Sequence, residues 1–80
     1  MDDKLQDYKI LSFNSGRPRI TRFNDCSKSQ VCCEFYKLQR IKDAFPIVIL
    51  DSENNFVLWN SYFELEEIHR LIDSTFKELI

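Results

Sequence analysis

A chain of 80 residues, 44% hydrophobic and 14% aromatic, has the length of one small domain and enough apolar side chains for one core. With one glycine and two prolines it is not a disordered linker, and no apolar run approaches the roughly 18 residues of a membrane-spanning helix. The net charge of −2 is uneven, because residues 1–42 carry +4 and residues 43–80 carry −6, which indicates two regions of opposite charge.

The first residues of the chain and its cysteines indicate where in the cell the protein is expected. Residues 1–4 are acidic and polar, whereas a secretory signal begins with positive charge followed by an apolar stretch. Three cysteines, Cys26, Cys32 and Cys33, cannot all pair within one chain. We therefore expect reduced thiols and a cytoplasmic protein, with residues 1–80 forming a single domain whose first seven residues fray.

The first predicted elements are two strands over residues 8–13 and 18–23. Between them, Gly16 is typical of a tight turn, because glycine adopts positive φ at little cost. Pro18 cannot donate a backbone hydrogen bond and belongs at a strand start or edge. A two-residue loop at Ser15-Gly16 predicts a definite register. It pairs Leu11 with Ile20, Ser12 with Arg19 and Tyr8 with Phe23.

A helix is predicted next. Ser27 and Gln30 fit a capping box, in which each side chain bonds the backbone of the other residue. The apolar residues that follow recur at helical spacing and predict one buried stripe: Val31, Phe35, Leu38, Ile41 and Phe45. Pro46 is expected to end this helix, since the residue before a proline avoids helical geometry.

The second half repeats the pattern of a hairpin followed by a helix. Residues 47–50 and 56–59 predict two strands around a polar turn, and Ser61 with Glu64 predicts a capping box for a helix that runs to the end. The order β-β-α-β-β-α predicts an α+β fold, with a four-stranded antiparallel sheet and both helices packed on one face.

Few features of the sequence indicate a catalytic, metal-binding or cofactor-binding site. Cys26, Cys32, Cys33 and His69 have the atoms that bind zinc, but their spacing lacks a C-x-x-C pair. A single glycine excludes the glycine-rich phosphate loops, and no cysteine or histidine lies in a recognisable nucleophile motif. We therefore predict a protein that is not an enzyme, with no catalytic residue, metal site or cofactor.

Protein interaction is the function that remains best supported. The basic first hairpin suits an acidic partner, and aromatic residues at the start of the last helix often anchor interfaces. We predict a small adaptor, inhibitor or immunity-type protein that docks on a larger protein. The residues predicted to bind the partner are Arg17, Arg19, Arg22, Trp59 and Tyr62.

Two further possibilities stay open. The first hairpin could instead bind nucleic acid, with cations on phosphates and an aromatic ring on a base. The residues for this alternative are Lys9, Arg17, Arg19, Arg22 and Tyr8. A homodimer formed by the last helix or by an open sheet edge is also compatible with the sequence.

Overall fold

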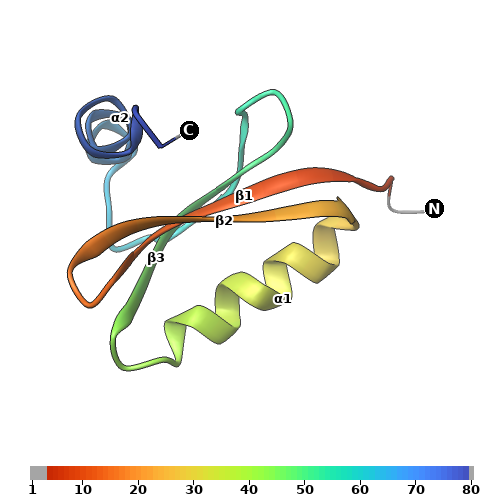
Figure 1. The fold of residues 1–80 in the computed structure, drawn as a ribbon, viewed down its shortest axis with the longest axis horizontal. Coiled ribbons are helices and arrows are strands. Elements are labelled where there is room, and N and C mark those ends of the chain that lie inside the picture. The colour runs from red at the N-terminus through yellow and green to blue at the C-terminus, as the bar shows by residue number, and fades with distance from the viewer. Residues whose placement is uncertain (1–3, 80) are drawn as a thin grey trace.

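A computed structural model describes residues 4–79 and contains one four-stranded antiparallel sheet with two helices (Figure 1). The strands lie in the order β2-β1-β3-β4. The elements are β1 (Gln6–Asn14), β2 (Arg17–Cys26), α1 (Lys28–Gln39), β3 (Ala44–Leu50), β4 (Phe56–Trp59) and α2 (Leu65–Leu71), which continues into a π-helical turn, η1 (Ile72–Phe76). The predicted α+β class and element order are confirmed. Residues 1–3 of the lead-in expected to fray lie outside the described residues, while β1 already begins at Gln6.

The first hairpin has the predicted register. Ser15 and Gly16 both adopt positive φ, at 52° and 79°, as the two central residues of a tight hairpin turn do. This loop fixes which residues of β1 and β2 lie opposite each other. The observed pairs include Leu11 with Ile20, Ser12 with Arg19 and Tyr8 with Phe23, as predicted.

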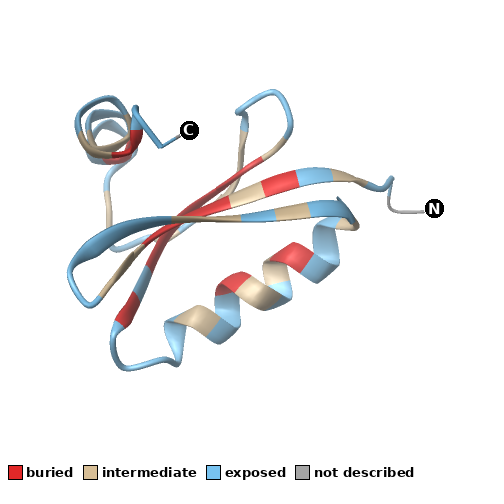
Figure 2. Cartoon of the chain, viewed as in Figure 1, coloured by how far each residue is buried: buried red, intermediate tan, exposed pale blue. Residues whose placement is uncertain are grey.

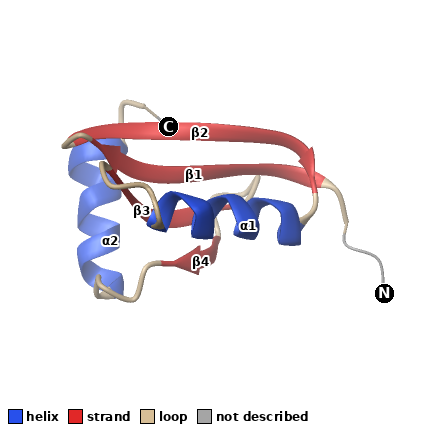
Figure 3. Cartoon of the chain, turned by 90° about the horizontal axis from the view of Figure 1, so that it is seen from below, coloured by secondary structure: helices blue, strands red, loops and turns tan. Residues whose placement is uncertain are grey.

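The two helices cover opposite faces of the sheet, so the prediction that both pack on one face is wrong (Figures 1 and 3). Successive side chains of a strand point to opposite faces. Leu11 and Val48 join a cluster with Ile68 of α2, whereas the neighbouring Ile10 and Ile49 join the cluster of α1.

Two separate cores follow from this arrangement. Figure 2 shows buried residues on the central strands and on the sides of both helices that face the sheet. On the α2 side the core includes Leu50 and Phe76, and on the α1 side it includes Val31 and Phe35. Both helices on one face would have left the other face of β1 and β3 exposed to water, at a free-energy cost proportional to its apolar area.

Both helices are shorter than predicted. α1 has the predicted capping box, in which the Gln30 backbone N–H donates to Ser27 Oγ at 3.2 Å and the Ser27 N–H donates to Gln30 Oε1 at 2.8 Å. The helix ends at Gln39, however, and residues 41–43 form a turn before β3. As a result Ile41 lies outside the helix and is 53% exposed.

The second helix begins three residues later than expected. Asn60 closes a turn, because its carbonyl accepts from the Phe63 N–H at 3.1 Å and its side-chain oxygen accepts from the Tyr62 N–H at 3.0 Å. Glu64, and not Ser61, is the N-cap residue of α2. Its backbone N–H donates to Glu67 Oε1 at 3.0 Å, so a glutamate pair takes the place of the predicted capping box.

Candidate functional site

The predicted partner-binding residues lie at two opposite edges of the sheet. Arg17, Arg19 and Arg22 belong to β2, which is one edge strand. Trp59 ends β4, the other edge strand, and Tyr62 follows it in the turn before α2. The structure therefore does not bring the arginines and the two aromatic residues together into one surface.

The three arginines are also divided between the two faces of β2. Residues two apart in a strand share a face, so Arg17 and Arg19 lie on the side of Phe23, which packs against the α1 cluster. Arg22 lies on the side of Ile20, which packs against the α2 cluster. Lys9 is the direct cross-strand partner of Arg22 and shares its face.

Tyr8, a residue of the nucleic-acid alternative, has a position that conflicts with its predicted role. Its exposed fraction is 3%, and it packs in the cluster formed with Val31 and Phe35 of α1. The alternation of β1 turns Tyr8 toward this core, while Lys9 points to the opposite face. The Tyr8 ring consequently offers no face on which a base could stack.

β2 is an open edge along ten residues, because β1 is its only neighbour in the sheet of the described residues. In a two-residue hairpin the residues that flank the loop, here Asn14 and Arg17, exchange backbone hydrogen bonds, and every second pair beyond them does the same. The residues between these pairs direct their backbone groups to the open edge. They are Pro18, Ile20 and Arg22, and the missing N–H of Pro18 is harmless there.

A groove runs between the α1 side of β2 and the helix. α1 packs more closely on β3 than on β2, which leaves space beside Phe23. One hollow, of about 320 Å³, extends from Phe23 to Cys33 and Lys37, and a second, of about 380 Å³, extends from Phe23 to Leu38 and Ile41. Apolar side chains thus line much of a groove that lies beside an open strand.

The groove is lined by more positively charged than negatively charged side chains. Glu34 lines both hollows, and its Oε1 lies 3.5 Å from Lys37 Nζ. Arg19 lines the second hollow and takes part in neither of the two ion pairs found in the described residues. The excess charge of the groove is therefore positive.

The sequence did not identify this groove. The predicted stripe places both Leu38 and Ile41 in the core. Leu38 does pack against the α1 cluster, but Ile41 lies beyond the end of the helix and is exposed. The sequence does contain one signal for the groove. The alternation of β2 places Arg19, Thr21 and Phe23 on one face of the strand, and a face with two polar side chains of three is not fully buried.

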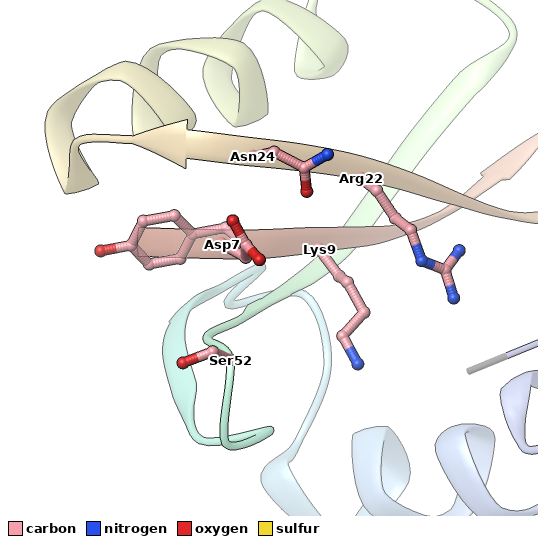
Figure 4. Close-up of a pocket in the computed structure, with 6 residues that line it drawn as sticks. Asp7, Lys9, Arg22, Asn24 and Ser52 are labelled. Atoms are coloured by element: carbon pink, nitrogen blue, oxygen red, sulfur yellow. The ribbon is translucent and has the colours of Figure 1, made fainter. Parts of the chain in front are cut away.

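A smaller polar pocket lies on the other face of β2, with a volume of about 210 Å³ (Figure 4). Asp7 and Lys9 reach it from β1, Arg22 and Asn24 from β2, and Ser52 from the β3–β4 turn. The Ser52 Oγ donates to Gln6 Oε1 at 3.5 Å, which holds the turn beside the start of β1. Two cations, two neutral polar side chains and one carboxylate thus line the pocket, together with Tyr8.

Several aromatic rings pack against one another near β4 and α2. His69 stacks on Phe56 with ring centroids 4.8 Å apart, and Phe56 in turn contacts Trp59 at 6.1 Å. Tyr62, 76% exposed, packs edge-on against Phe45 at 5.4 Å. The structure therefore gives His69 a packing role, and Trp59 and Tyr62 stay candidate partner contacts on a surface separate from β2.

Within residues 4–79 no three side chains of His, Cys, Asp or Glu are grouped so that they could hold a metal ion. Cys26 and Cys33 line the groove beside α1, and no disulfide joins the cysteines in this part of the chain. Neither described helix is long and apolar enough to cross a membrane.

Comparisons with known proteins add no relative. No protein-family model, no curated protein and no solved structure matches this chain.

Proposed function

We propose that this protein is a non-enzymatic protein-binding module that docks an extended segment of a larger partner along the open edge of β2. The observation that carries the proposal is the ten-residue edge strand beside a partly apolar groove. An extended peptide can add a strand to such an edge, so that backbone hydrogen bonds supply affinity and side-chain pockets supply specificity.

The groove and its charge define the segment. Every second side chain of an added strand would point to the α1 side, where Phe23, Leu38 and Ile41 favour apolar groups. Arg17 and Arg19 lie on the same face and favour carboxylates nearby. The proposed ligand is therefore an extended stretch that combines apolar and acidic residues, in keeping with an adaptor, inhibitor or immunity-type role. We place the protein in the cytoplasm, which keeps thiols reduced.

The test is a selection of linear peptides from a random display library, followed by titration of the best peptide. Ile20→Pro removes a backbone N–H that faces the open edge, whereas Ile20→Ala removes a similar amount of side chain and keeps the N–H. We expect Ile20→Pro to weaken binding about tenfold more than Ile20→Ala does, because a lost donor also leaves the peptide's acceptor unpaired. Circular dichroism checks that both variants fold.

Two further variants locate the surface. Ile41→Glu should weaken the same peptide by placing a carboxylate in the groove, and Trp59→Ala, at the opposite edge, should leave its affinity unchanged. Loss of affinity in Trp59→Ala alone would move the docking surface to β4 and overturn the proposal. If light scattering finds a dimer that Ile20→Pro dissociates, the occupant of the edge is a second copy and no partner segment is needed.

Nucleic acid is the second candidate, favoured by three arginines within one exposed strand. The buried Tyr8 and the division of the arginines between two faces count against it. It predicts affinity for single-stranded oligonucleotides that falls with salt and collapses in the double variant Arg19→Glu, Arg22→Glu. Absence of oligonucleotide binding at low salt would eliminate it.

A further inference from the structure

The polar pocket contains two like charges in direct apposition. Lys9 and Arg22 are cross-strand partners, an arrangement that is unfavourable when nothing neutralises the charges. Both ion pairs of the described residues lie elsewhere, in α1 and α2. Lys9 Nζ instead donates to Asn54 Oδ1 at 2.6 Å, and Arg22 Nη2 donates to the Leu79 carbonyl at 3.3 Å. Neutral acceptors thus hold both side chains, and neither cation forms an ion pair within the described residues.

The donors of this pocket come from two adjacent strands. Lys9 reaches it from β1, and Arg22 and Asn24 reach it from β2 (Figure 4). Ser52 lines the pocket from the β3–β4 turn, but its hydroxyl proton is donated to Gln6. A carboxylate is planar and can be matched by one arginine, whereas a tetrahedral oxyanion has oxygens for donors on several sides. An ammonium and a guanidinium on separate strands can bind different oxygens of one tetrahedral anion, which favours the phosphate class.

Asp7 lines the same pocket and determines which oxyanion fits. Its Oδ1 accepts from the Asp25 backbone N–H at 3.1 Å, and within residues 4–79 its Oδ2 has no donor. A carboxylate repels an anion that has lost all its protons. It can, however, accept a hydrogen bond from the P–OH group of a protonated phosphate.

We propose that this pocket binds a hydrogen-phosphate group, with Lys9 and Arg22 on its charged oxygens and Asp7 accepting from its P–OH. The group is either free hydrogen phosphate or a singly protonated phosphate monoester. The site lies on the opposite face of β2 from the proposed peptide groove, so it does not rest on that proposal and can be tested separately.

The test compares phosphate with sulfate, which has the same shape and no proton. Amide NMR spectra are recorded at about pH 6, near the second pKa of a phosphate ester, and at constant ionic strength. Inorganic phosphate should shift the amides of Asp7, Lys9, Arg22 and Ser52 to saturation and bind at least tenfold more tightly than sulfate. Equal affinities, or tighter binding of the more highly charged sulfate, would overturn the proposal, because a nonspecific basic surface has no group that recognises the P–OH.

Three variants identify the groups involved. Lys9→Gln should weaken phosphate binding by roughly tenfold, the value of one charge-assisted hydrogen bond. Arg19→Gln, which removes an arginine from the other face of the same strand, should bind phosphate as the wild type does. Asp7→Asn keeps the oxygen that accepts from Asp25 and should bring the phosphate and sulfate affinities together. Unchanged affinity in Lys9→Gln, or unchanged discrimination in Asp7→Asn, would contradict the proposed site.

A last titration, with O-phosphoserine, distinguishes the two sources of the group. Tighter binding of phosphoserine than of inorganic phosphate assigns a phosphate ester as the ligand, and the reverse assigns the free ion. Both results support the pocket, whereas binding of neither overturns it.

Discussion

Phe35 and Tyr36 are neighbours in α1 whose exposed fractions are 1% and 52%. Truncation of Phe35 to Ala would open a cavity in the core between α1 and the sheet and should lower the free energy of unfolding by about 3–5 kcal/mol. Tyr36→Ala removes a ring that is mostly in water and should cost less than about 1 kcal/mol. Urea unfolding of both variants measures the difference, and equal losses would mean that α1 presents a different side to the sheet.

A substitution in the hairpin loop at Ser15-Gly16 should increase the stability of the protein. Ser15 adopts φ of 52°, which asparagine tolerates better than serine, and Asn-Gly is the preferred pair for this turn. Ser15→Asn should therefore raise the free energy of unfolding by roughly 0.5 kcal/mol. The substitution does not affect the hydrogen bond from the backbone N–H of residue 15 to the Asp43 carbonyl. Thermal unfolding would detect this as a higher midpoint, and a lower midpoint would contradict the assigned turn.

The positions at which the two helices begin can be tested by mutation. Ser27 caps α1 with its side chain, whereas Ser61 lies in a turn before α2. Ser27→Ala should cost about 1 kcal/mol of stability, the usual value of a lost N-cap, and Ser61→Ala should cost close to nothing. Chemical denaturation of the two variants is the measurement. A large loss in Ser61→Ala would support the helix start that the sequence predicts and contradict the one observed at Glu64.

The elements that were predictable depend on signals within a few residues. The register of the first hairpin followed from Ser15-Gly16, and the start of α1 followed from Ser27 and Gln30. The faces covered by the helices were not predictable in this way, since a helix with one apolar side satisfies the same pattern above or below a sheet.

The deciding signal was present in the central strands. Residues 47–50 are all apolar, which is typical of a strand covered on both faces, and the adjacent Ile10 and Leu11 require cover on both sides as well. For the candidate site, the arginines of β2 were found from charge alone. The groove could not be found, because it depends on where α1 ends and on which strand it packs.

Over the whole molecule, the strand order separates the proposed roles. β1 and β3 lie at the centre of the sheet between two cores, and β2 and β4 form its edges. The two edges differ, since β4 has only four residues and borders aromatic rings, while β2 has ten and carries three arginines. A short edge offers little backbone for pairing. Of the two edges, β2 therefore offers more backbone for the proposed added strand.

This arrangement predicts the order in which backbone amides exchange with deuterium. Amides of β1 and β3 are bonded within the sheet and covered by α1 and α2, so they should open only by global unfolding and exchange most slowly. Amides of β2 that face the open edge, those of Ile20 and Arg22, should exchange fastest within that strand. Adding the selected peptide should slow these two selectively, because an added strand would accept from them, while β4 should be unaffected. Hydrogen exchange followed by NMR resolves each amide, and slow exchange at Ile20 and Arg22 without peptide would mean that the edge of β2 is already occupied in solution.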